Sequence, residues 1–317
     1  MRLGTRASAL ALAQAELVAR LLGASAAGDP QAVEIVPIVT RGDRESAGVD
    51  DTAGELAGDG RPGEPPPGED KSRWVSELER ALLDGRIDIA VHSAKDVPTE
   101  LPEGLELVAI PERAEARDVI CGASTLAALA PGAKVGTSSL RRAAQVRAVR
   151  DDLEVREVRG NVDTRLRKLA GGEVDALILA AAGLERLGRG AEAGGVIDEF
   201  VPAAGQGALA LEARSGAIDA QRLAPVSDPD ATACVTAERV LVHALGASCN
   251  TPVGAHARVV GGGRLTLAAW VGLPDGSAWL RDEVTADAAE VGMACAGRML
   301  AAGAADLLRQ AEAAVTA

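Results

Sequence analysis

A short run of polar side chains follows an apolar stretch near residue 90. Its members are His92, Ser93, Lys95 and Asp96. The apolar residues before it alternate with other residue types, which predicts a strand over 87–91 that ends before Pro98. A strand that delivers polar groups at its carboxyl end is typical of the ligand site of an open α/β sheet. An isolated Lys-Asp pair would be an ordinary surface ion pair, but the remaining motifs favour a site at Lys95 and Asp96.

His92 allows two interpretations. It could act as a catalytic base, because imidazole titrates near neutral pH. It could equally be a half-buried group at the end of a strand, hydrogen-bonded to its neighbours, and we favour this second interpretation.

Basic residues are concentrated between positions 138 and 168. The motif Gly136–Arg142 lies between a predicted strand and a predicted helix, so Ser138 or Ser139 would cap that helix. The motif Arg159–Arg165 repeats this design, with Asn161 as the cap. Arginine is unfavourable near a helix N-terminus, which itself attracts anions. We therefore expect Arg141, Arg142, Arg159 and Arg165 to have anionic partners, whereas a solvated basic face suits Arg147, Arg150 and Arg167. Arginine binds carboxylates and phosphates alike, so this pattern alone does not name the anion.

The four cysteines fall into two groups. Cys234 and Cys295 lie in apolar helical patterns, and Cys121 ends a strand, so all three are expected in the core. Cys249 lies in a polar loop and is the candidate nucleophile, because nucleophilic attack needs an accessible thiolate. No Cys-x-x-Cys pair occurs and only three histidines are present, which argues against a zinc site.

The composition bounds the class of protein. The chain has 317 residues, 47% of them hydrophobic, which is typical of a globular protein of two or three domains. The formal net charge of −13, with one Phe and no Tyr, argues against nucleic-acid binding. No transmembrane run or apolar signal core is visible, so we expect a cytoplasmic protein with reduced thiols.

The elements that must hold these residues alternate between strand and helix over most of the chain. Strands are expected over 2–4, 33–39, 87–91, 105–110, 119–122, 134–136, 154–158, 174–180 and 205–211. Helices are expected over 9–22, 74–82, 140–149 and 162–169. This alternation predicts α/β units with mostly parallel sheets. From about residue 228 a helix, three short strands and one or two Ala-rich helices predict a small α+β domain.

Eight stretches, in this order, resemble those of the porphobilinogen deaminase (hydroxymethylbilane synthase) family. They are 2–8 with Gln14, 39–43, 91–98, 135–142, 159–165, 177–184, 204–208 and 249–254. The similarity covers nearly the whole chain. No single stretch is decisive, but eight in order are highly specific.

This resemblance implies three domains: residues 1–110 with 202–227, residues 111–201, and residues 228–317. The first two would be lobes like those of periplasmic binding proteins, with the site in the cleft between them. It also implies an enzyme that joins four porphobilinogen molecules head to tail, with loss of ammonia, and releases hydroxymethylbilane. The growing chain would start on a dipyrromethane cofactor bound to Cys249 by a thioether. No metal, nucleic acid or membrane is implied, and a monomer is expected.

The resemblance also assigns roles to residues. Asp96 matches the catalytic carboxylate. The positions that match cofactor- and substrate-binding residues are Arg6, Ser8, Gln14, Ser93, Lys95, Thr137, Ser138, Ser139, Arg141, Arg142, Arg159, Gly160, Arg165 and Arg186. An arginine-lined cleft suits a product that carries an acetate and a propionate on each ring.

One stretch departs from the family pattern, and two alternative functions stay open. Residues 44–72 form a Gly/Pro-rich acidic stretch that differs from the family's loop, and we expect it to be a disordered insertion. The runner-up function is a two-lobed anion-binding protein without catalysis, and an inactive relative is a third possibility. The joint presence of Asp96, Cys249 and the arginines argues against both.

Overall fold

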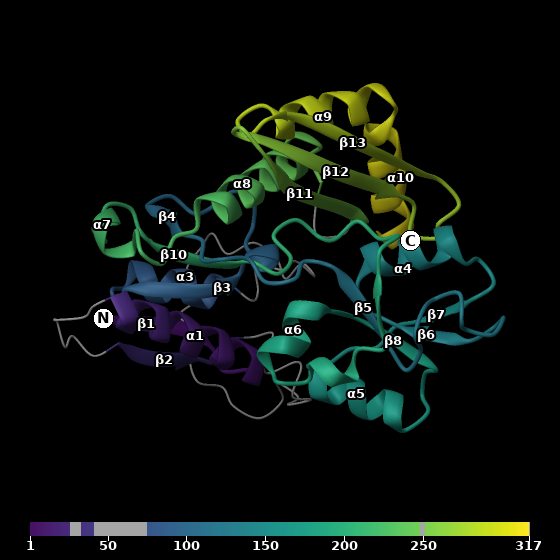
Figure 1. The fold of residues 1–317 in the computed structure, drawn as a ribbon, viewed down its shortest axis with the longest axis horizontal. Helices are drawn as coiled ribbons and strands as arrows, with labels where there is room; N and C mark the ends of the chain where they lie inside the picture. The colour runs from purple at the N-terminus through teal and green to yellow at the C-terminus, as the bar shows by residue number, and fades with distance from the viewer. Residues whose placement is uncertain (26–32, 41–74, 248–250, 317) are drawn as a thin grey trace.

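The computed structural model describes residues 1–25, 33–40, 75–247 and 251–316. The acidic stretch 44–72 and the loop residue Cys249 lie outside these described residues. Three separate sheets organise the described chain, with helices packed against each (Figure 1).

The first sheet has the strand order β2-β1-β3-β10-β4. The strand bounds are β1 (Arg2–Arg6), β2 (Glu34–Ile38), β3 (Ile89–Ser93), β4 (Leu105–Ala109) and β10 (Leu209–Arg214). Strand β1 runs parallel to β2 and β3, whereas β10 runs antiparallel to β3 and β4. Because successive residues of β3 point to opposite faces, Ile89 packs with helix α1 (Ala9–Ser25) and Ala90 packs with helix α3 (Ser76–Leu83).

The second sheet has the strand order β7-β6-β8-β5-β9. The strand bounds are β5 (Asp118–Cys121), β6 (Lys134–Gly136), β7 (Glu154–Arg156), β8 (Ala176–Ala180) and β9 (Gly195–Ile197). Helices α5 (Val162–Ala170) and α6 (Ala181–Arg186) cover one face, and α4 (Leu140–Val149) covers the other. Strand β6 is parallel to β7 and β8, and β5 is antiparallel to β8 and β9.

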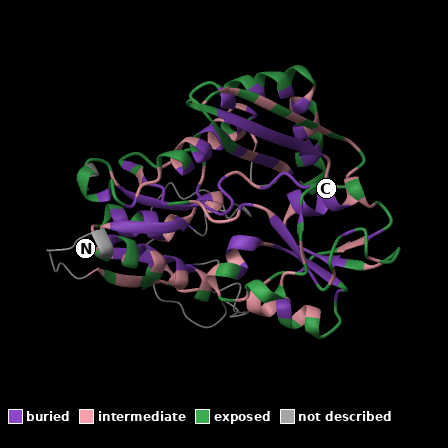
Figure 2. Ribbon diagram, viewed as in Figure 1, coloured by how far each residue is buried: buried purple, intermediate pink, exposed green. Residues whose placement is uncertain are grey.

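The third sheet is antiparallel and lies near the C-terminus. It contains β11 (Val253–Gly261), β12 (Arg264–Gly272) and β13 (Trp279–Asp287). Helices α8 (Pro229–Ala244), α9 (Val291–Ala301) and α10 (Ala304–Thr316) share one buried aliphatic cluster with it. Figure 2 shows the central strands of all three sheets as buried and the outer helix faces as exposed.

Two crossing segments join the first and second sheets. The chain leaves after β4 and returns before β10, and the two segments meet where the Ala114 N–H donates to the Gly207 carbonyl at 3.3 Å. A Cβ on Gly207 would lie 2.4 Å from the Ala114 oxygen, and its φ of +86° is also unfavourable for other residues. Glycine at this position therefore allows the two segments to lie in contact.

The predicted fold class is confirmed, with differences of detail. The two large sheets are mixed, because β10 and β5 run antiparallel to their neighbours where mostly parallel sheets were expected. Strand β3 ends at Ser93, and the residues 94–96 that follow form the 3₁₀ turn η2 (Ala94–Asp96). Strand β9 and helix α6 were not predicted, since both are short and carry little periodicity.

Among the described helices, no single one is long and apolar enough to cross a membrane. Helices α9 and α10 pass the test of length and composition only as a pair, which is bent by 77°. Their apolar residues pack in the cluster on the third sheet.

Candidate active site

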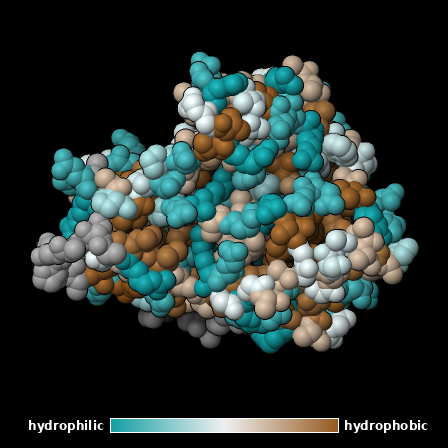
Figure 3. Space-filling view, in the orientation of Figure 1, coloured by the Kyte–Doolittle hydropathy of each residue, from teal (hydrophilic) through white to brown (hydrophobic). Residues whose placement is uncertain are grey.

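A cavity of about 90 Å³ lies between the first and second sheets and gathers seven of the sixteen predicted site residues. Its lining comes from α1, β3 and η2 on one side and from β8 and α6 on the other. The predicted residues that line it are Arg6, Ser8, Gln14, Ser93, Lys95, Asp96 and Arg186. Figure 3 shows that hydrophilic and hydrophobic side chains are intermixed over one face of the whole molecule.

The end of β3 places Lys95 and Asp96 at the cavity. The strand is buried up to His92, and the chain then turns through η2 instead of continuing as a strand. The Val97 N–H donates to the Ala94 carbonyl at 3.3 Å, and this bond closes the turn. The turn leaves both charged side chains half-buried on the cavity wall.

The N-terminus of α1 lines the same side of the cavity as the end of β3. Ser8 Oγ accepts a hydrogen bond from the Ala11 N–H at 3.4 Å and so caps the helix. The hydroxyl of Thr5 donates to the Ala11 carbonyl at 3.0 Å and ties β1 to the helix. Arg6 and Gln14 are thereby held on the same wall, so the helix end, which favours anions, faces the cavity.

Arg186 reaches the cavity from α6 of the second sheet. Its Nη2 donates to the Gly207 carbonyl at 2.6 Å. Its Nε is buried without a hydrogen-bond partner among the described residues, and burial lowers the pKa of the guanidinium. An unused donor on a buried cation suits an anionic ligand.

His92 lines the cavity and forms a buried pair with Glu212. Its Nε2 lies 2.8 Å from Glu212 Oε2, and both side chains are almost fully buried. The hydrogen bond agrees with the favoured interpretation of His92 as a bonded strand-end group, but the side chain is buried rather than half-buried, and its partner is 120 residues away in sequence. Close by, burial and the charge of Glu212 raise the pKa of Glu79 to about 7.

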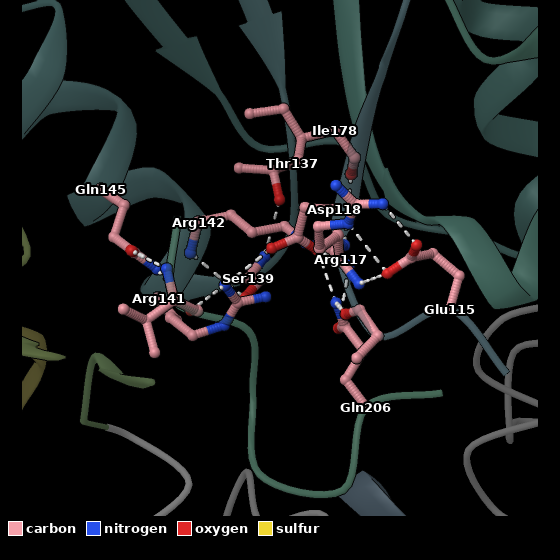
Figure 4. A network of polar contacts seen from close by, with 12 residues as sticks. Glu115, Arg117, Asp118, Thr137, Ser139, Arg141, Arg142, Gln145, Ile178 and Gln206 are labelled. Atoms are coloured by element: carbon pink, nitrogen blue, oxygen red, sulfur yellow. Dashed lines mark hydrogen bonds and ion pairs between the residues drawn. The ribbon is translucent and has the colours of Figure 1, made fainter. Parts of the chain in front are cut away.

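On the second sheet, Arg141 and Arg142 lie in the first turn of α4 and are buried (Figure 4). Ser139 caps this helix by accepting from the Arg142 N–H at 3.4 Å, and the Ser139 N–H donates to Thr137 Oγ1 at 3.2 Å. Ser139 is therefore the N-cap, and Ser138 is exposed.

The anion opposite these two arginines is Asp118, which the sequence reasoning missed. Arg141 Nη1 donates to Asp118 Oδ2 at 2.8 Å, and Arg142 Nε donates to Asp118 Oδ1 at 2.9 Å. Gln206 Nε2 donates to the same Oδ1 at 2.8 Å from the returning crossing segment. Burial alone would raise the pKa of Asp118, but the two guanidinium charges outweigh it and hold that pKa below its ordinary value. Asp118 therefore balances one of the two positive charges of Arg141 and Arg142 within the chain.

Arg165 is the contrasting case. Its Nε donates to the Gly160 carbonyl at 2.7 Å, and burial together with the charge of Arg142 lowers its pKa to about 10. The predicted cap Asn161 is confirmed, since its side chain accepts from the Thr164 N–H at 2.9 Å. Arg159 is exposed and donates to Glu157 at 2.7 Å.

The cavity lining does not include the other predicted binding residues. These are Thr137, Ser138, Ser139, Arg141, Arg142, Arg159, Gly160 and Arg165. Their roles stay predictions. Of the residues expected on a solvated basic face, Arg167 is exposed, whereas Arg147 donates to the Pro274 carbonyl and Arg150 to two loop carbonyls.

The described cysteines match their expected core positions. Cys121, Cys234 and Cys295 are buried, and burial raises the pKa of each thiol to about 11. A thiol with so high a pKa is a poor nucleophile at neutral pH. None of these three is therefore a candidate for covalent attachment.

Comparison with known proteins decides the family. The model for "Porphobilinogen deaminase, dipyromethane cofactor binding domain" matches residues 1–222, and the model for "Porphobilinogen deaminase, C-terminal domain" matches residues 232–301. The chain belongs to the porphobilinogen deaminase family. The porphobilinogen deaminase of Deinococcus deserti is 48% identical, and that of Thiobacillus denitrificans is 46% identical, each comparison covering 96% of both chains.

Solved structures with a similar backbone include periplasmic binding proteins. A periplasmic substrate-binding protein of an ABC transporter from Coxiella burnetii has a TM-score of 0.43 and 14% identity, covering 73% of this chain and 94% of its own. A nutrient-binding protein from Burkholderia cenocepacia bound to methionine has a TM-score of 0.42 and 12% identity, covering 73% of this chain and 93% of its own.

The described residues fit a cofactor that carries several carboxylates. Arg186 lines the cavity with a buried Nε that has no hydrogen-bond partner within the described ranges. Arg165, in helix α5, forms no ion pair with the described residues, and burial and another arginine lower its pKa. Both observations suit a ligand that brings negative charge with it.

Proposed function

We propose that this member of the family is a hydroxymethylbilane synthase. It takes porphobilinogen as substrate, joins four molecules head to tail with release of ammonia, and releases the linear tetrapyrrole for tetrapyrrole biosynthesis. The observation that carries this proposal is the cavity in which the Asp96 carboxylate lies among Arg6, Lys95 and Arg186.

Asp96 is the proposed catalytic residue. Positive charge develops on a pyrrole ring when ammonia leaves and when the next ring attacks, and a fixed carboxylate stabilises that charge. The same carboxylate can accept a proton from the attacking ring carbon and pass it on. The turn η2 holds Asp96 on the cavity wall, where such contacts are possible.

The cations around Asp96 are the proposed binding groups. Each porphobilinogen ring carries two carboxylates, so a chain of rings needs many positive partners. Arg6, Lys95 and Arg186 lie at the cavity, with Ser8, Ser93 and Gln14 as neutral hydrogen-bonding groups. Arg165 would hold carboxylates further along the second sheet, together with Arg159, Gly160, Thr137, Ser138 and Ser139. Arg141 and Arg142 would contribute there only with the charge that Asp118 leaves unbalanced.

Cys249 is the proposed attachment site of dipyrromethane. When bound, this group supplies the primer to which the substrate rings are joined. The three other cysteines are buried with raised pKa values, which leaves Cys249 as the thiol suited to a thioether.

The proposed domains follow the three sheets. Residues 1–110 with 202–227 would form the first domain, 111–201 the second and 228–317 the third, in agreement with the membership of each sheet. A cytoplasmic monomer that binds neither nucleic acid nor membranes is proposed from the composition, with a net charge of −13.

The test combines product stoichiometry with the mass of the protein. The purified chain should release one ammonia per porphobilinogen consumed and one tetrapyrrole per four. Its intact mass should exceed the sequence mass by two pyrrole units, and peptide mapping should place the excess on Cys249. A Cys249→Ser protein with normal turnover would contradict the attachment site. Tight binding of porphobilinogen without ammonia release would instead support the two-lobed anion-binding protein.

A further inference from the structure

We propose that Arg239 of helix α8 is a positioning residue that holds the turn carrying Asp96. This inference rests on the proposed function, because it concerns the geometry of the proposed catalytic carboxylate. Arg239 belongs to the third sheet's helices, whereas Asp96 belongs to the first sheet. Figure 1 shows α8 running between these two parts of the molecule.

The turn η2 has few hydrogen bonds of its own. It contains three residues, and its closing bond from the Val97 N–H to the Ala94 carbonyl is long at 3.3 Å. A second backbone bond, from the Ala94 N–H to the Ala208 carbonyl at 3.0 Å, ties its start to the returning crossing segment. The position of Asp96 therefore depends on what packs around the turn.

One side of the turn rests on the same crossing segment. A Cβ on Gly205 would lie 2.8 Å from the Ala94 carbonyl carbon and 2.9 Å from the Lys95 nitrogen. Backbone therefore packs directly against backbone here, and only glycine permits it.

Arg239 holds the residues directly after Asp96. Its Nη2 donates to the Pro98 carbonyl at 2.6 Å and to the Thr99 carbonyl at 3.1 Å, and its Nη1 donates to the Val97 carbonyl at 3.1 Å. One planar guanidinium thus holds three successive carbonyls from two nitrogens at fixed positions, whereas an ammonium has all its donors on one nitrogen. The side chain is half-buried, and burial lowers its pKa.

The neighbouring residue on α8 holds the opposite side. Glu238 is fully buried and accepts from the Gly205 N–H at 2.7 Å and from Arg113 Nη1 at 2.6 Å. Glu238 therefore fixes the crossing segments on which the turn rests, and Arg239 fixes the exit from the turn. One helix thereby determines where the Asp96 carboxylate lies relative to Arg6 and Arg186.

The experiment compares three variants of the cofactor-loaded protein. They are Arg239→Gln, Arg239→Lys and the control Arg258→Gln, which removes an exposed arginine of β11 that pairs with Glu283. Turnover of porphobilinogen and hydrogen–deuterium exchange of the peptide that contains residues 94–99 are measured on each. Loss of the three carbonyl contacts should lower kcat of Arg239→Gln by about 10- to 100-fold, because small misplacement of a reacting group is costly. KM should stay within about twofold, since the binding cations are unchanged.

The exchange measurement needs no turnover and separates this inference from the proposed function. Exchange of the 94–99 amides should rise about tenfold in Arg239→Gln, less in Arg239→Lys, and stay unchanged in Arg258→Gln. If Arg239→Gln does not fold, Arg239→Lys decides the question, because it retains the positive charge and loses the planar guanidinium. A kcat within about twofold of the unaltered protein overturns the inference, as does a fall in kcat with unchanged exchange. Absence of turnover in the unaltered protein would count against the proposed function. The exchange result alone would then decide whether Arg239 holds the turn.

Discussion

Arg141 and Arg165 lie in the first turns of successive helices of the second sheet, yet they differ in how their charge is balanced. Arg141, together with Arg142, is bound to the buried carboxylate of Asp118. Arg165 donates to a backbone carbonyl, and its pKa falls to about 10 because burial and Arg142 both disfavour its charge. Burial of a cation with an internal anion organises the fold, whereas burial without one favours an external anion.

The same contrast separates the carboxyl groups. Asp118 lies opposite two guanidinium groups, and its pKa is held low. Glu79 lies near a second carboxyl group, Glu212, and its pKa is raised to about 7. Removing a buried charged group that has an oppositely charged partner within the chain is expected to affect stability strongly. Removing a charged group without such a partner, such as Arg165 or Glu79, is expected to affect ligand binding or the pH dependence of stability.

The largest effect is expected from Asp118→Asn. It leaves two buried guanidinium groups without a full negative charge, which should lower the free energy of unfolding by about 3–5 kcal/mol. Urea denaturation followed by circular dichroism measures this loss. Glu283→Gln, which breaks an exposed pair with Arg258, serves as the control and should cost far less. Equal losses in the two variants would remove the distinction between balanced and surface arginines.

The sequence predicted the local structure around Asp118 but could not predict its role. The helix caps Ser139 and Asn161 and the strand at β6 follow from residues within a few positions of each other. Asp118 is bound by residues 23 and 24 positions away, and Gln206 is 88 positions away. The Glu212 partner of His92 is 120 positions away. Pairs between residues far apart in sequence leave no signal in the spacing of neighbouring residues. The sequence therefore indicated the arginines but not the residues that pair with them.

Asp96→Asn should have the next largest effect. The neutral amide cannot stabilise developing positive charge or take up a proton, so kcat should fall by about 100-fold or more. The thermal midpoint should change little, because Asp96 is half-buried at the cavity. Glu100→Gln, an exposed carboxylate of the same segment, is the matched control and should retain full turnover. An Asp96→Asn protein with an unchanged rate would refute the catalytic assignment.

Glu79→Gln tests the unbalanced carboxyl group through pH. The folded pKa of Glu79, about 7, lies above the ordinary value of 4.5, so the folded state holds the proton more tightly than the unfolded state. Stability from this group is therefore complete at low pH and is lost as pH rises from about 4.5 to 7. Between pH 5 and 8 the unaltered protein should lose roughly 2 kcal/mol relative to Glu79→Gln. Chemical denaturation across this range measures the difference, and parallel pH curves would show that Glu79 is not the group responsible.

Arg165→Gln should have the smallest effect on the fold and a selective effect on the ligand. Removing a half-buried cation that has no anionic partner among the described residues should leave the thermal midpoint unchanged or slightly higher. The KM for porphobilinogen should rise about tenfold, because a charge-assisted contact to a carboxylate is lost. Arg167→Gln, two residues further along α5 on its exposed face, is the control and should change neither quantity. If Arg165→Gln instead lowers the midpoint as Asp118→Asn does, Arg165 has an internal role, and the contrast between the two arginines fails.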